Sequence, residues 1–178
     1  MKQKGFSLIE LLIVVAIILI IAAIAIPNLL RSRMAANEAS AVGSLRTMNT
    51  ALVTYSSTYP ATSFPSAVLS LQPAVGNPTA IQADLLDQVL SGQNPATVTP
   101  QKSGYQFQYT GGVATTGVPA GVATYGIGTW PISQNTSGIR GFATTQAGVI
   151  YDCGPSGANP YAGGTGAVPP AAPCLPIQ

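Results

Sequence analysis

The side chains of this sequence that could do chemistry are few, and one of them sits in an unusual place. Glu10 is followed by sixteen unbroken apolar residues, 11–26, so its carboxylate lies at the edge of a segment that should avoid water. An acidic group in such a segment is costly and usually has a function. The remaining candidates are two late cysteines and three scattered carboxylates: Cys153, Cys174, Asp84, Asp87 and Asp152.

These groups do not form a recognisable catalytic or metal site. The sequence has no histidine, so general base catalysis near neutral pH would need a tuned carboxylate or lysine. Asp84 and Asp87 would share one helix face, where a solvated polar surface explains them better than a paired-carboxylate site. These two residues and Asp152 could offer oxygens to Ca²⁺, but a dense acidic loop is missing. We therefore expect no catalytic residue, no cofactor and no metal site.

The apolar segment is long enough to cross a membrane. As a helix, residues 6–26 would span roughly 31 Å, about one hydrocarbon core. The twelve Leu, Ile and Val residues of the run supply roughly −4 to −7 kcal/mol of insertion free energy, which exceeds the cost of Glu10, at most about 3.5 kcal/mol. Lys2 and Lys4 precede the span, so the positive-inside rule keeps the N-terminus cytoplasmic and exports the chain after Pro27.

Glu10 also fits a purely structural role. Ser7 and Glu10 have the spacing of a capping box, in which the serine bonds the backbone of the glutamate and the glutamate reaches back. A carboxylate at a helix N-terminus also meets the positive end of the helix dipole. Capping can coexist with a second role, so both interpretations stay open at this point.

The two cysteines lie in the part of the chain that we expect to be exported. An even pair in an oxidising compartment indicates a disulfide between Cys153 and Cys174. Closing the loop 153–174, which has almost nothing to form a core, should contribute roughly 3 kcal/mol to stability. Two thiols without any histidine make a metal site the poorer alternative.

The order of the N-terminal features resembles the signal of type IV pilins and type II secretion pseudopilins, and is most like a type IVa pilin. That signal has a basic leader ending in Gly, then Phe-[Ser/Thr]-Leu-Ile-Glu-Leu. Here Gly5 is followed by Phe6-Ser7-Leu8-Ile9-Glu10-Leu11. A conventional secretory signal, cut after Ala25 for example, would have a shorter apolar region.

The resemblance implies how the chain is processed and assembled. A prepilin peptidase would cut between Gly5 and Phe6 and methylate the new amine of Phe6. Glu10 would then pair with the Phe6 amine of a neighbouring subunit. The partners implied are other copies of the chain or related pilins, the peptidase, the inner membrane and its assembly platform. The subunit would cross the inner membrane once, with a periplasmic head, before it enters an extracellular filament.

A long helix should continue beyond the membrane segment. An apolar stripe at spacings of four and three predicts an amphipathic helix to about residue 58; it consists of Ala41, Leu45, Met48, Leu52 and Tyr55. Pro27 should kink the rod because it lacks an N–H. The expected organisation is a leader at 1–5, a transmembrane and assembly helix at 6–27, an amphipathic helix at 28–58 and a head domain at 59–178.

The head domain should combine a short helix with antiparallel strands. Apolar spacing predicts a second helix over residues 80–90. Alternation predicts strands over 105–109 and 122–130, and a hairpin made of 139–145 and 149–153. The fold class is therefore α+β: a long kinked N-terminal helix packed on a small antiparallel sheet of about four strands, with a disulfide-closed C-terminal loop.

Charge and composition narrow the function further. Without Lys2 and Lys4 the side chains balance, five basic against five acidic, so no basic patch indicates a nucleic-acid partner. A nearly neutral surface suits a subunit that its neighbours cover. The favoured hypothesis is a structural subunit of a type IV pilus-like filament, for adhesion or motility. The alternatives are a type II secretion pseudopilin and a signal-anchored periplasmic binding domain that never polymerises.

Overall fold

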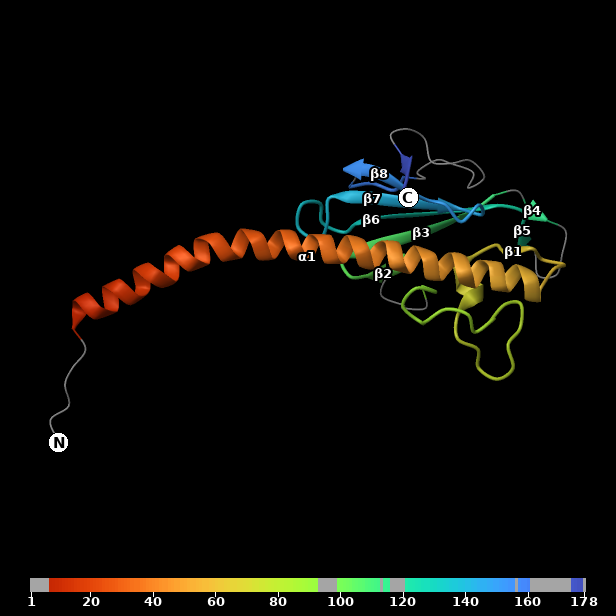
Figure 1. The fold of residues 1–178 in the computed structure, drawn as a ribbon. Coiled ribbons are helices and arrows are strands. Elements are labelled where there is room, and N and C mark those ends of the chain that lie inside the picture. Colours follow the sequence, from red (N-terminus) through yellow and green to blue (C-terminus); the bar gives the residue numbers. More distant parts are fainter. Residues whose placement is uncertain are drawn as a thin grey trace.

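A single helix, α1 (Leu8–Thr58), extends from one end of the molecule and forms one wall of the head. The computed structural model describes residues 7–92, 99–112, 114–115, 121–155, 157–160 and 174–177. Figure 1 shows α1 as a bowed rod whose first half projects away from everything else, while its second half lies across a sheet. The α+β class predicted from the sequence is confirmed.

The second half of α1 packs through the predicted stripe. Ala41, Leu45, Met48, Leu52 and Tyr55 are all 0–1% exposed. Their spacing places them on one face, and burial of that face stabilises the helix far more than intrinsic propensity does. The helix ends at Thr58, before Tyr59 and Pro60, because a residue that precedes proline disfavours the α conformation.

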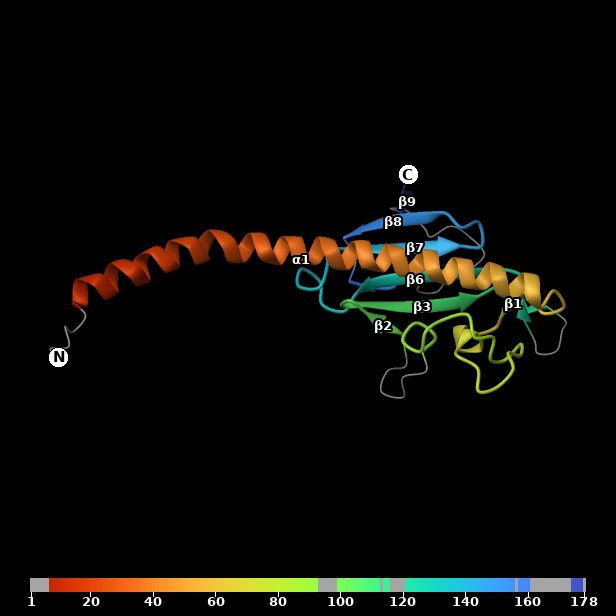
Figure 2. The same ribbon diagram turned by 60° about the horizontal axis from the view of Figure 1, so that its bottom comes forward.

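Among the residues that the structure describes, the main sheet has six antiparallel strands in the order β2-β3-β6-β7-β8-β9. Four of them are long: β3 (Tyr105–Gly111), β6 (Tyr125–Pro131), β7 (Arg140–Thr145) and β8 (Ile150–Pro155). These correspond to the strands expected from alternation. The edges add two-residue strands, β2 (Gln101–Lys102) and β9 (Leu175–Pro176). In Figure 2 the long strands run alongside α1.

A smaller sheet lies at the far end of α1, with the order β1-β5-β4. Its strands are two residues each: β1 (Phe64–Pro65), β4 (Ala114–Thr115) and β5 (Gly121–Val122). Between β1 and the main sheet, the described residues include a short 3₁₀ helix, η1 (Val68–Leu71).

The helix predicted over residues 80–90 is absent, and that prediction was wrong. Asp84 has a φ of 56°, which an α-helix does not allow. The backbone N–H groups of Ala83 and Asp84 donate to the carbonyls of Ser70 and Gln72 rather than to their own preceding turn. The segment therefore pairs with the η1 region. Its apolar spacing reflects this packing, because Ala83, Leu86 and Leu90 are the buried members.

The core lies between α1 and one face of the main sheet. Aromatic and branched side chains from alternate strand positions fill it, and each is at most 1% exposed: Tyr105, Phe107, Tyr125, Ile127 and Phe142. Alternation on β3 puts its polar residues on the opposite face. The head is thus a sheet with one face covered by the second half of α1.

Candidate functional site

No part of the head that the structure describes covers the first half of α1. Every large apolar side chain from Leu8 to Leu30 is between 45% and 80% exposed. The helix is long and apolar enough to span a membrane by length and composition, and none of that apolar stretch is buried within the fold. A continuous apolar surface of this size cannot face water, so lipid or other protein must cover it.

Glu10 sits in the first turn of this uncovered helix. Its Oε2 accepts a hydrogen bond from the backbone N–H of Ser7 at 2.9 Å, as the capping-box pattern predicted. The bond satisfies one of the donors that a helix N-terminus leaves without an intrahelical partner. The carboxylate is exposed and lies among apolar side chains. The capping interaction therefore exists, and it leaves the group accessible to a second partner.

The other N-terminal predictions remain predictions. Gly5 and Phe6, the expected cleavage and methylation positions, lie outside the described residues. Pro27 lies inside α1, and the helix continues through it without a break. The ribbon bends gently over this half of the helix in Figure 1.

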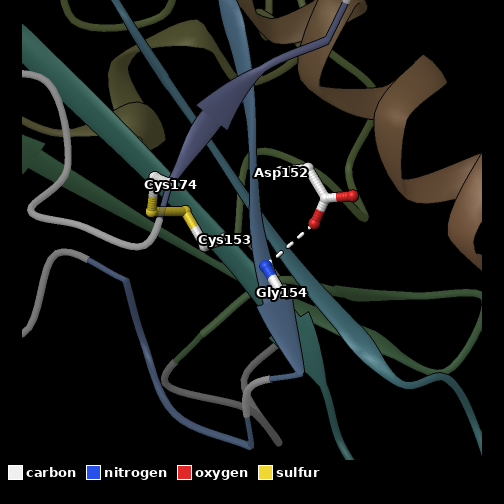
Figure 3. The surroundings of a disulfide bond; sticks show 4 residues. All are labelled: Asp152, Cys153, Gly154 and Cys174. Carbon is white, nitrogen blue, oxygen red and sulfur yellow. Dashed lines mark hydrogen bonds between the residues drawn. A yellow bond between two sulfur atoms is a disulfide. The ribbon is translucent and has the colours of Figure 1, made fainter.

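The predicted disulfide is present. Cys153 on β8 is bonded to Cys174, which directly precedes β9, with 3.8 Å between their Cα atoms. Figure 3 shows the bridge beside Asp152, whose carboxylate accepts a hydrogen bond from the backbone N–H of Gly154 at 2.9 Å. Register pairs Asp152 with Leu175, so the bond fastens β9 to the edge of the main sheet. The bridge thus closes the loop that follows β8.

An ion network that the sequence did not suggest joins α1 to the sheet. Glu38 projects from α1 and is only 8% exposed. Its Oε2 accepts hydrogen bonds from the Nε and Nη2 of Arg140, at 2.9 and 2.7 Å. Its Oε1 accepts from the backbone N–H groups of Ile139 and Arg140 at 3.0 and 3.2 Å. Arg140 also contacts Asp152 of β8, with 2.8 Å between Nη1 and Oδ2.

We call this network of Glu38, Arg140 and Asp152 the clamp, because it holds α1 against β7 and β8. The hydrogen bonds that the Arg140 guanidinium donates to Glu38 raise the pKa of this group further, so the cation is permanent. Glu38 was not among the residues that the sequence indicated as functional. The available signal was that Arg140 is the only arginine after residue 46, and a lone arginine in a strand region often pairs with a buried carboxylate.

A second polar contact lies further along the same interface. Asn49 of α1 is 8% exposed; its side chain donates to the Thr144 hydroxyl at 2.8 Å and accepts from the Tyr125 hydroxyl at 3.0 Å. Buried polar groups of this kind are costly unless bonded, so the pairing helps to set the position of the helix on the sheet. Glu38 and Asn49 together fasten α1 at two levels.

The scattered carboxylates do not gather into a site. Asp87 forms a 3.8 Å salt bridge with Lys102, whereas Asp84 stands on an exposed turn. Because the predicted helix is absent, the two do not share a helix face. Within the described residues no group of three or more His, Cys, Asp or Glu side chains could hold a metal ion.

Comparison with known proteins agrees with the N-terminal pattern. Residues 1–26 match the family model described as the prokaryotic N-terminal methylation motif. The type IV wide pilus major component PilA4 of Thermus thermophilus is 69% identical over 37 residues. That match covers 21% of this chain and 28% of the relative, so the chain spans less than a third of the length of this relative. No solved structure matches significantly.

These findings support the resemblance to type IV pilins. The matched region carries both the basic leader and the apolar helix with Glu10. The head domain lies outside the matched motif, so its architecture is described by the structure alone.

Proposed function

We propose that this chain is the structural subunit of a type IV pilus-like filament, held together by the first half of α1. The observation that carries the proposal is the uncovered apolar surface from Leu8 to Leu30, joined without a break to a folded head. Bundled helices from several copies would cover this surface, as lipid does before assembly. The proposal assigns no catalytic residue and no cofactor.

The proposal also includes how the N-terminus of the chain is processed before assembly. A prepilin peptidase would remove residues 1–5 after Gly5 and methylate the amine of Phe6. Until extraction, the helix would hold the subunit in the inner membrane with its N-terminus in the cytoplasm and its head in the periplasm. The assembly platform of the inner membrane would then deliver the subunit to the growing filament.

Glu10 would set the register between copies in the bundle. A free amine at Phe6 is a cation, and an exposed carboxylate among apolar side chains is the partner that lowers the cost of burying it. The Oε2 oxygen already accepts the N–H of Ser7. A carboxylate has further acceptor positions on its two oxygens, so capping within one chain is compatible with a contact between chains.

The direct test is the intact mass and N-terminal sequence of the protein sheared from cells that produce it. We expect a chain that begins at Phe6, carries one added methyl group and is two hydrogens lighter because of the Cys153–Cys174 bond. A processed chain that stays in the periplasm would indicate a pseudopilin. A chain that keeps residues 1–5 and is absent from the sheared fraction would contradict the proposal and indicate an anchored monomer.

A further inference from the structure

The head carries a groove between α1 and the disulfide-bonded edge of the sheet. Its volume is about 700 Å³, and its walls come from α1, β7, β8 and β9. Its apolar lining includes Val42 of α1 together with Leu175 and Ile177, which are 71% and 38% exposed. The groove therefore offers an apolar channel on the outside of the head.

Of the charged side chains that line the groove, Arg46 is available to a partner outside the head. Glu38, Arg140 and Asp152 line the groove but are bonded to one another. Arg46 also lines it, is exposed, and has no salt bridge among the residues that the structure describes. The groove thus combines apolar walls with an available cation.

An exposed surface of complementary character lies elsewhere on the same head. In the segment 75–89, Val75, Ile81 and Val89 are 91%, 62% and 45% exposed. Asp84, which lies between Ile81 and Val89 in the sequence, is exposed as well, and across the described parts of the chain no salt bridge involves it. This acidic segment, residues 75–89, therefore exposes apolar side chains and one available carboxylate.

The two surfaces lie on opposite sides of α1. In Figures 1 and 2, β8 and the C-terminal end lie above the helix while the chain of the acidic segment lies below it. They also lie at different levels. The Tyr55 hydroxyl donates to the carbonyl of Ala80 at 2.7 Å, which fixes the acidic segment nine residues, about 14 Å of helix, beyond Arg46. They cannot meet within one molecule.

We propose that the groove of one copy receives the acidic segment of a second copy, with an ion pair between Arg46 and Asp84 at the contact. The interface is heterologous, because two different patches of the same chain meet. Such contacts generate a closed ring when the rotation between copies closes, and an open helical array when it does not. The different levels require the second copy to be displaced along α1, as successive copies in a filament are. This inference rests on the proposed function, because it places the contact between filament subunits.

Charge reversal at the two positions tests the contact in full-length protein. We expect Arg46→Glu and Asp84→Arg each to lower the amount of sheared filament by about threefold to tenfold, because like charges then face each other. The double variant, R46E with D84R, should restore the yield. Co-expression of the two single variants should restore it as well, because alternating copies again place opposite charges in every groove.

Matched controls separate this contact from folding and from the proposed function. Thr47→Glu adds a carboxylate beside Arg46 at an exposed position that does not line the groove, so it should leave the yield unchanged. Equal membrane levels of every variant, with the disulfide formed, show that the heads fold. If wild-type protein forms no filament at all, the proposed function itself fails.

Two outcomes would overturn the contact while the proposed function stands. One is filaments at wild-type yield from both single variants. The other is a loss of yield that neither the double variant nor co-expression reverses. Under the first of these outcomes, loss of a different protein from the sheared fraction would show that the groove binds that protein instead of a second copy.

Discussion

The carboxylate of Glu38 and the guanidinium of Arg140 meet across 102 residues of chain, with 2.7 Å between Oε2 and Nη2. The glutamate is nearly buried, and the arginine side chain is 48% exposed. The Oε2 oxygen of Glu38 accepts two hydrogen bonds from the guanidinium, and the Oε1 oxygen accepts two from backbone N–H groups. This contact fixes the point where the helix first meets the sheet.

Removal of Glu38 should therefore weaken the head strongly. Glu38→Ala leaves the backbone N–H groups of Ile139 and Arg140 without their acceptor. We therefore expect a loss of about 3 kcal/mol in the free energy of unfolding. Denaturant unfolding in detergent, followed by the fluorescence of Trp130, the only tryptophan, measures this loss. Asp152→Asn, at a more exposed position, should cost less than about 1 kcal/mol. Equal effects would contradict the clamp.

Alkaline pH should destabilise the head through its tyrosines. Burial raises the pKa of Tyr125 to about 12, above the ordinary value of about 10. The folded state therefore keeps a proton that the unfolded chain loses. The tyrosine's contribution to stability is complete below pH 10 and falls as pH rises through 12. Burial also raises the pKa values of Tyr105 and Tyr109.

The substitution Tyr125→Phe isolates one of these groups. We expect the free energy of unfolding to fall less steeply from pH 9 to pH 11.5 in this variant than in the wild type. The variant also loses the bond to Asn49, so the comparison concerns the slope with pH rather than the absolute value. Identical slopes would show that Tyr125 ionises equally in both states.

Loss of the disulfide should destabilise the head without abolishing its sheet. The bond closes a loop with a sequence separation of 21, which the chain-entropy model values at about 3 kcal/mol. Cys153→Ala combined with Cys174→Ala should lower the free energy of unfolding by about this amount. Reduction of the wild type should reproduce the effect, and the double variant should be insensitive to reductant. A reductant effect on the double variant would exclude the bond as its cause.

Two glycines should respond in opposite directions to alanine. A Cβ on Gly121 would collide with the backbone carbonyls of Thr62 and Phe64, so Gly121→Ala should cost at least about 2 kcal/mol. Gly43 lies in α1 with open space around it, so Gly43→Ala should stabilise the helix by about 0.5–1 kcal/mol. Thermal unfolding of the two variants under one condition compares them. A stabilising shift from Gly121→Ala would contradict the packing at β1 and β5, and a destabilising shift from Gly43→Ala would contradict the open space at that position of α1.

The proposed register role of Glu10 predicts a defect in assembly alone. Glu10→Gln keeps an oxygen that can accept the N–H of Ser7, yet removes the negative charge. We expect normal insertion and cleavage, with a clear fall in filament yield. Immunoblots of membrane and sheared fractions report the two steps separately. Wild-type filament yield from this variant would leave capping as the only role of the residue.

Local patterns predicted most of the framework because short-range physics determines it. The stripe from Ala41 to Tyr55 required only helical periodicity, and the strands β3, β7 and β8 required only alternation and turns. The two-residue strands were not foreseen because such short segments carry no periodic signal. They exist through pairing with distant parts of the chain, as β9 does with β8.

The wrong helix prediction and the missed ion pair also depend on contacts between distant parts of the chain. Residues 80–90 have helical spacing, but their backbone bonds go to the η1 region, which sequence periodicity cannot reveal. The pairing of Glu38 with Arg140 likewise depends on the placement of α1 on the sheet. Glu10 was found because a charge beside an apolar run stands out locally, without knowledge of the tertiary structure.

The two polar fastenings between α1 and β7 give the head a mechanical property. Glu38 binds Arg140 at one end and Asn49 binds Thr144 at the other, so helix and strand run side by side in the same direction. A tensile force along the helix axis therefore loads both fastenings and the apolar stripe between them together, in shear. Separation by peeling would break them one after another at lower force. Traction along the first half of α1 would therefore meet the resistance of all these contacts at once.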